Sequence, residues 1–215
     1  MREGFISQLE KLHAELILMG ALCEDAIASA IKGLIDEDEA LQKKVVQLEN
    51  EINHKEREIE DFCLRLLIRE QPVAGDLRQI NAAQKLIANM ERIGDQAFDI
   101  AELSAFMMGS HIKSDVHITD MARATVTMLQ KSVDSFVSGD IDGAKEVIAY
   151  DDAVDDLFVK IKSELVDEIA KDPGGGGECL DLLMIAKYLE RIGDHAVNIA
   201  EQVIYTGTGE RGSTE

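Results

Sequence analysis

A five-residue stretch, Glu-Arg-Ile-Gly-Asp, occurs twice in this chain of 215 residues and constrains its fold more than any other feature. The first copy covers 91–95 and the second covers 190–194, 99 positions further on. The likeness continues downstream, because ERIGDQAFDIAE and ERIGDHAVNIAE agree at 9 of 12 positions. A match of this length at a single offset indicates that the chain contains two copies of one structural unit.

Both copies lie in segments whose apolar residues recur at helical spacing. Around the second copy, Leu182, Ile185, Leu189, Ile192 and Ala196 follow one another at intervals of three and four. The first copy has the same pattern. This period predicts that each copy lies within a long helix with one buried face.

The two acidic residues of each copy are four positions apart, so they share one helix face. Like charges at this spacing destabilise an isolated helix by about 0.2–0.5 kcal/mol. A hard cation with oxygen ligands would offset that repulsion. A solvated acidic surface is the alternative interpretation, because charged helix faces are commonly exposed.

Each copy also holds a glycine, Gly94 or Gly193, in the interior of its predicted helix. Such a glycine costs about 1 kcal/mol relative to alanine. Its occurrence in both copies predicts either close approach of a neighbouring helix or open space beside the carboxylates.

The composition limits both the location and the partners. The net charge is −20, from 42 acidic against 22 basic residues, which disfavours nucleic-acid binding. The charged N-terminus has no signal-peptide core, and uncharged runs such as 103–112 are too short to span a membrane. Three well-separated cysteines indicate reduced core residues. We therefore expect a cytoplasmic protein without membrane insertion.

The periodic segments predict six long helices in an all-α fold. Gln71-Pro72 and Gly139-Asp140 break the pattern, Gly174–Gly177 predicts a flexible loop, and 207–215 predicts a frayed tail. The expected helices cover about 5–35, 39–70, 75–106, 114–138, 142–170 and a last segment ending near 206. They predict two tandem antiparallel three-helix bundles related by the internal repeat, over 1–110 and 111–215.

Alignment of the two halves extends the acidic pattern to the second helix of each bundle. Asp151 and Asp155 repeat the four-residue acid spacing, and they align with Glu49 and Asn53. Acidic residues from two packed helices are what an oxygen-liganded metal site requires. The sequence thus predicts two sites, and the one with Asn53 is the weaker. Their ligands are Glu91, Asp95, Glu49 and Asn53 in the first bundle, and Glu190, Asp194, Asp151 and Asp155 in the second.

Three stretches resemble the PhoU family: ERIGDHAVNIAE, the preceding LLMIAKYL, and RLLIREQPVAGDLR over 65–78. The resemblance covers nearly the whole chain. It implies two three-helix bundles, homodimer formation, and a metal ion cluster held by E(D)xxxD motifs. It places those motifs at Glu91/Asp95, Glu190/Asp194 and Asp151/Asp155, and Asn53 departs from the pattern.

The resemblance also implies a role. Members are accessory proteins of the phosphate-specific ABC transport system and negative regulators of the phosphate-starvation response. Their partners are the transporter ATPase and a phosphate-sensing histidine kinase, and they are not enzymes. Carboxylate ligands suit Mg, Ca, Mn or Fe and do not exclude Zn, so the sequence leaves the identity of the metal open.

Parts of the sequence are compatible with two other functions. Glu10-x-x-His13 and Glu51-x-x-His54 match the ligand spacing of carboxylate-bridged di-iron enzymes. Both histidines lie beside the apolar stripes, which predicts surface positions, and the remaining ligands of such a site are not evident. His195, inside the second motif, is a possible extra ligand or a residue lining the face. The other alternative is a metal-free helical adaptor with solvated acidic faces.

Overall fold

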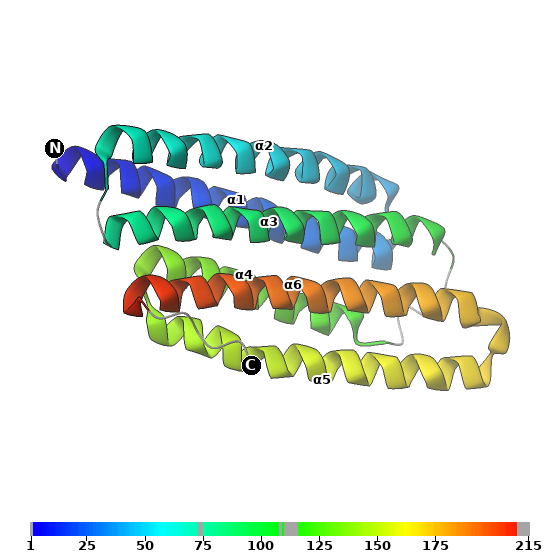
Figure 1. Ribbon diagram of the computed structural model, residues 1–215. Helices are drawn as coiled ribbons and strands as arrows, with labels where there is room; N and C mark the ends of the chain where they lie inside the picture. The colour runs from blue at the N-terminus through cyan, green and yellow to red at the C-terminus, as the bar shows by residue number, and fades with distance from the viewer. Residues whose placement is uncertain (1, 73–74, 108, 110–115, 210–215) are drawn as a thin grey trace.

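The computed structural model describes residues 2–72, 75–107, 109 and 116–209, and it consists of six long helices (Figure 1). The first three are α1 (Arg2–Asp36), α2 (Glu39–Glu70) and α3 (Gly75–Phe106). The second three are α4 (Ile118–Ser138), α5 (Ile141–Lys171) and α6 (Gly176–Thr208). No strand occurs within these described ranges, so the all-α prediction is confirmed.

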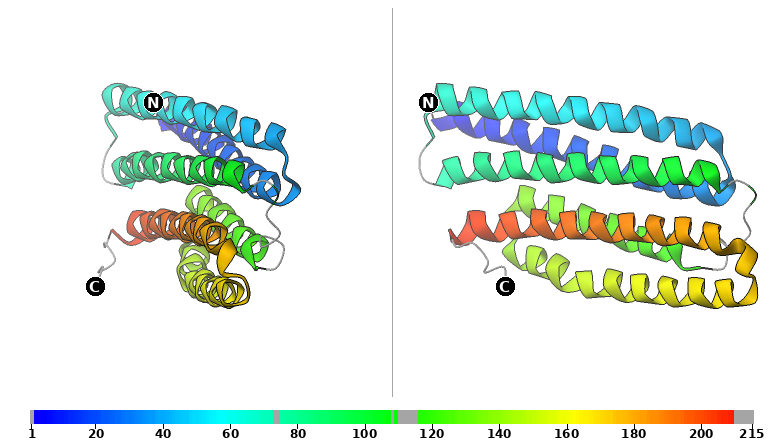
Figure 2. Two further views of the ribbon diagram at one scale, coloured as in Figure 1. Left: turned by 90° about the vertical axis from the view of Figure 1, so that its right-hand side faces the viewer. Right: turned by 45° about the vertical axis from the view of Figure 1, so that its right-hand side comes forward.

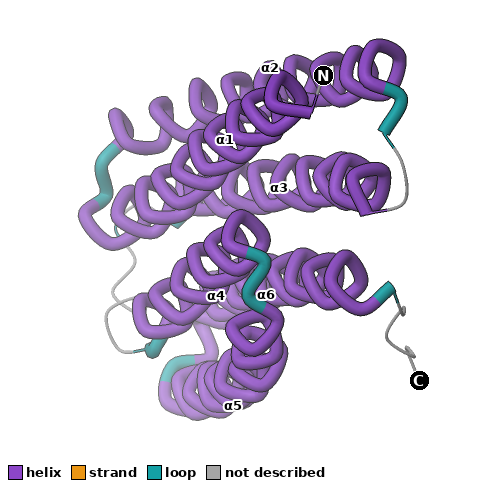
Figure 3. Tube along the Cα trace, turned by 90° about the vertical axis from the view of Figure 1, so that its left-hand side faces the viewer, coloured by secondary structure: helices purple, strands orange, loops and turns teal. Residues whose placement is uncertain are grey.

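Each run of three helices packs as one bundle. Within the first bundle α1, α2 and α3 all contact one another, and α4, α5 and α6 do so in the second. The views along the helices separate the two groups clearly (Figure 2, left, and Figure 3). The expected pair of three-helix bundles is therefore present, with the α3 motif packed against α2 and the α6 motif against α5.

The two bundles are joined by a broad interface that the repeat alone did not predict. α3 packs against α6, and α1 packs against α4. Figure 1 shows α3 and α6 side by side through the middle of the molecule, with α2 and α5 at its edges. The buried hydrophobic residues of both halves consequently form one continuous cluster.

The predicted apolar stripes supply this core. On α1, the residues Leu12, Leu16, Met19, Cys23 and Ala26 are at most 1% exposed. All three cysteines are buried and free, as predicted. Burial raises the pKa of the Cys63 thiol to about 12, which makes it an unreactive core residue. No helix in the described part of the chain is long and apolar enough to cross a membrane.

Several helix boundaries differ from the predicted ones, most clearly at the glycine run. The expected flexible loop over Gly174–Gly177 is wrong, because Pro173–Gly175 forms a 3₁₀ turn and α6 begins at Gly176. The Asp172 side chain stabilises the turn by accepting a hydrogen bond from the Gly174 backbone N–H (2.9 Å). Gly176 and Gly177 thus lie in the first turn of α6, where the helix leaves its N–H groups unpaired in any case.

The other boundary changes are smaller. α4 begins at Ile118 rather than near residue 114, and residues 114–115 lie outside the described part. α6 continues to Thr208, past the predicted end near residue 206, and Gly209 follows in the left-handed conformation. The rest of the expected frayed tail, 210–215, is likewise outside the described residues.

Candidate functional site

The motif glycines bring each motif helix close to its neighbour. A Cβ atom on Gly94 would lie 3.1 Å from Ile52 on α2. A Cβ on Gly193 would lie 3.3 Å from the Asp151 carboxylate oxygen and 3.5 Å from Val154, both on α5. Close helix approach therefore explains both glycines, and at Gly193 it sets a carboxylate directly over the backbone of the motif.

Acidic residues of α5 and α6 gather at this contact in the second bundle. Burial raises the pKa of Asp151 to about 6, and the negative charges of Asp155, Asp194, Asp152 and Glu190 raise it further. The structure thus brings together the four residues predicted for the second site. The pKa is raised because burial and neighbouring negative charges both disfavour ionisation.

Two residues of this cluster differ in their surroundings. The pKa of Asp194 is raised by burial and by Glu190, and Lys187 partly opposes the shift. The same lysine forms an ion pair with Glu190 on α6. Because Lys187 already pairs with Glu190, a cation at this face would compete with the lysine for that carboxylate. Asp155, the remaining carboxylate, is exposed.

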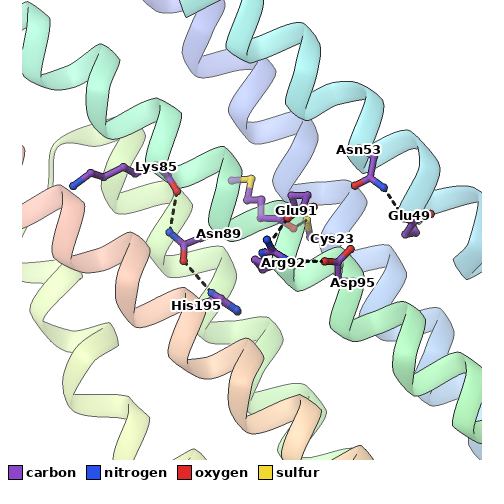
Figure 4. A network of polar contacts seen from close by, with 10 residues as sticks. Cys23, Glu49, Asn53, Lys85, Asn89, Glu91, Arg92, Asp95 and His195 are labelled. Carbon is purple, nitrogen blue, oxygen red and sulfur yellow. Dashed lines mark hydrogen bonds and ion pairs between the residues drawn. The ribbon is translucent and has the colours of Figure 1, made fainter.

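The first bundle has a corresponding group. Burial and the charge of Asp95 raise the pKa of Glu91, Arg92 opposes the shift, and Glu56 and Glu49 on α2 add to it. Figure 4 shows Glu49 and Asn53 on α2, and Glu91 and Asp95 on the neighbouring α3. The first predicted ligand set also lies across one pair of helices.

Asn53 forms a local pair that separates this site from the second. Its amide nitrogen donates a hydrogen bond of 2.5 Å to the Glu49 carboxylate. Its amide oxygen is buried and has no hydrogen-bond partner. An unpaired buried oxygen costs about 1–3 kcal/mol, and a bound cation would remove that cost.

Arg92 takes up part of the acidic charge of the first site. Its guanidinium lies 3.4 Å from Glu91 and 3.3 Å from Asp95 (Figure 4). The arginine side chain is 62% exposed, so these pairs contribute little to stability. Like Lys187 in the second bundle, Arg92 is a cation already present at the acidic face.

The side chains do not converge on a preformed metal position. Within the described ranges, no group of three or more His, Cys, Asp or Glu residues is placed to hold a metal ion. The donor chemistry still fits a hard cation, since it combines carboxylates with the free oxygen of Asn53. A cation bound there would have to displace Lys187 from Glu190, and Arg92 from Glu91 and Asp95.

Glu56 is a further acidic residue near the first site that was not predicted from the sequence, and its charge helps to raise the pKa of Glu91. Glu49 and Glu56 are seven residues apart on α2, or two helical turns, so they share a face. That spacing was a usable signal, but the alignment of the halves concealed it because Phe158 stands at the corresponding position of α5.

His195 has a role between the bundles rather than within the acidic face. Its Nδ1 lies 2.9 Å from the Asn89 side-chain oxygen on α3. The Asn89 amide nitrogen donates to the Lys85 carbonyl oxygen, which orients the oxygen toward the imidazole (Figure 4). His195 Nδ1 must therefore carry the proton in this hydrogen bond. The contact links the two motif helices.

The di-iron alternative finds little support in the arrangement of its histidines. His13 was predicted at the surface, but it is half-buried. Its ring packs edge-on against that of Phe136 on α4, with 6.3 Å between the ring centres. His54 is exposed and lies 3.3 Å from Glu58. The two side chains thus contact different groups instead of sharing a site.

Comparison with known proteins gives consistent matches over the whole chain. A model of the PhoU domain matches twice, at residues 16–104 and 118–203. The phosphate-specific transport system accessory protein PhoU homolog of Clostridium acetobutylicum is 35% identical, over 98% of this chain and 97% of its own. The Escherichia coli protein PhoU is 31% identical, over 96% of this chain and 86% of its own.

A solved structure matches the fold equally well. The crystal structure of PhoU from Pseudomonas aeruginosa superposes with a TM-score of 0.88 at 35% sequence identity. The match covers 96% of this chain and all of that one. The twofold domain match corresponds to the repeat seen in the sequence.

Proposed function

The chain belongs to the PhoU family, and we propose that it is a regulatory accessory protein of a phosphate-specific ABC transport system. The observation that carries the proposal is the double PhoU-domain match, together with relatives of that name aligned over 96–98% of the chain. In this role the protein acts by binding, and it restrains phosphate uptake and phosphate-starvation signalling. Its proposed partners are the transporter ATPase subunit and a phosphate-sensing histidine kinase, reached from the cytoplasm as a homodimer.

The charge of the molecule supports docking on a basic partner surface. With a net charge of −20, long-range attraction should accelerate encounter with positively charged patches of the ATPase or the kinase. Such attraction is screened over about 10 Å at 0.1 M salt, so binding should weaken as salt is added.

The experiment for the accessory role is a binding assay with the cognate transporter ATPase and kinase. We expect capture of at least one of them at low salt, and constitutive phosphate-starvation signalling in cells that lack the protein. Normal repression in those cells, together with no capture at low salt, would contradict the proposal.

Metal binding at the acidic faces is the finer part of the proposal. Asp151, Asp155, Glu190 and Asp194 would hold a cation in the second bundle. Glu49, Asn53, Glu91 and Asp95 would hold one more weakly in the first. When bound, the metal supplies charge neutralisation and ties α5 to α6. The raised pKa of Asp151 and the unpaired oxygen of Asn53 are the supporting observations.

The metal proposal is tested by the pair Glu190→Gln and Asp194→Asn, made together. In this variant, the second site should hold no metal after gentle purification. Chelator should then no longer lower the stability of the variant through that site. At a hundredfold excess over its dissociation constant, a cation should stabilise the wild type by about 2.7 kcal/mol. If Mn, Fe, Mg and Zn all fail to bind the wild type, the acidic faces are only solvated surface, and the metal-free adaptor is the better description.

A further inference from the structure

The sequence stretch 65–78 contributes to the family resemblance but holds none of the proposed metal ligands. The structure brings its two ends together in the wall of one pocket. Leu67 near the end of α2 and Leu77 and Arg78 at the start of α3 line this pocket. Asn81, Gln84 and, from the end of α6, Tyr205 complete it. Its volume is about 300 Å³, at the lower end of the range for small-molecule sites.

The charge of this pocket is unlike that of the molecule. The chain has 42 acidic residues, yet none of the described residues lining the pocket is acidic. Arg78 is the charged member of the lining. Lys85 adds a second positive charge nearby, since its ammonium group lies 6.0 Å from the centre of the Tyr205 ring.

Arg78 has unused hydrogen-bonding capacity. It lies at the start of α3 and is only partly buried, but its Nε atom is buried and has no hydrogen-bond partner. None of the ion pairs among the described residues involves it. Among the described residues, this arginine has no ion-pair partner and lies beside the side-chain amides of Asn81 and Gln84.

We propose that this pocket binds the phosphate group of a small molecule, with Arg78 as the anchoring residue. The guanidinium presents paired N–H donors that match phosphate oxygens. The side-chain amides of Asn81 and Gln84 offer further N–H donors, so that with the guanidinium the pocket holds more donors than the two oxygens of a carboxylate would use. Leu67 and Leu77 provide an apolar wall for the carbon part of a phosphate monoester.

This site is separate from the acidic faces and does not depend on the proposed transport role. It is tested by titration calorimetry on the full chain, with inorganic phosphate in one arm and glycerol 3-phosphate in the other. Chelator is present throughout so that phosphate cannot bind through a metal, and sodium chloride keeps the ionic strength constant. Acetate serves as the carboxylate comparison. Saturable binding in either phosphate arm, tighter than acetate, is expected.

The variant Arg78→Gln should weaken phosphate binding at least about tenfold, the loss expected for one charge-assisted pair. Arg57→Gln, which makes the same charge change at an exposed position on α2, should leave it unchanged. Arg78→Lys, which keeps the charge but not the paired donors, should bind phosphate with intermediate affinity. Circular dichroism checks that each variant folds. Equal affinity of the wild type and Arg78→Gln would overturn the proposal. So would saturable binding in neither phosphate arm.

Discussion

At the scale of single residues, Asp151 shows how the acidic face and the stability of the fold are linked. Its pKa is about 6 in the folded chain, against 3.8 for an unperturbed aspartate. Between these values the folded state holds a proton that the unfolded state has released. Stability therefore decreases as the pH rises from about 4 to about 6, and the loss persists above that range.

Asp151→Asn should remove this penalty when no metal is present. In chelator at pH 8, we expect the variant to unfold at higher urea concentration, with a gain of about 1 kcal/mol after allowance for solvent screening. At pH 4 most of this difference should disappear, because Asp151 is then protonated in the folded state and partly protonated in the unfolded state. Asp156→Asn, an exposed change on the same helix, is the control and should shift stability little at either pH. A less stable Asp151→Asn protein at pH 8 would show that the carboxylate is stabilising as it stands.

At the scale of helices, the motif glycines determine how closely two elements pack. Gly94→Ala would place a Cβ 3.1 Å from the Ile52 side chain. Ile52 is fully buried, so it cannot move aside into solvent. The helix gains about 1 kcal/mol of propensity but loses about 1–3 kcal/mol from overpacking. We expect net destabilisation of about 1 kcal/mol, measured by urea unfolding.

Gly177→Ala is the matched control for this prediction. It lies in the first turn of α6, where an added Cβ meets nothing within 4 Å. Here only the gain in helix propensity applies, so the variant should be more stable by a fraction of about 1 kcal/mol. If both alanine variants are stabilised to the same extent, the contact with Ile52 does not prevent a larger residue at position 94.

The helices themselves could be predicted from the sequence because apolar periodicity reports burial directly. The stripe from Leu182 to Ala196 on α6 is buried as expected. Gly174–Gly177 could not be assigned in this way, since glycine tolerates both loops and helix starts and the Asp172 cap decides between them. The contact of His195 with Asn89 could not be predicted either, because it depends on how the bundles dock and not on either repeat.

The residues of the candidate site could be predicted only in part, for a related reason. Spacing along one helix placed Glu190 with Asp194, and the repeat added Asp151 from the facing helix. Glu56 was missed because the repeat is inexact on α2. The cations that occupy the acidic face, Lys187 and Arg92, depend on side-chain orientation, which periodicity does not specify.

At the scale of the whole molecule, the two bundles are repeated in sequence but share a single core. α3 and α6 pack through the centre, and α1 and α4 pack against each other as well. Each bundle therefore buries apolar surface that it would expose to water if it were alone. A repeat with such an interface should unfold as one unit, since loss of one half removes the packing partner of the other.

Core truncation in either half should consequently destabilise the whole chain. Leu86 on α3 and Leu189 on α6 are fully buried, one in each bundle. Leu86→Ala and Leu189→Ala should each cost about 2–5 kcal/mol and lower one common melting temperature by about 4–20 °C. Calorimetry on full-length protein in chelator measures this, because a single transition gives equal calorimetric and van't Hoff enthalpies. Two resolved transitions, with Leu86→Ala shifting one and Leu189→Ala the other, would instead mean that the bundles are stable separately. A cation at one acidic face could then stabilise only its own half, whereas a shared core would transmit that stabilisation to both.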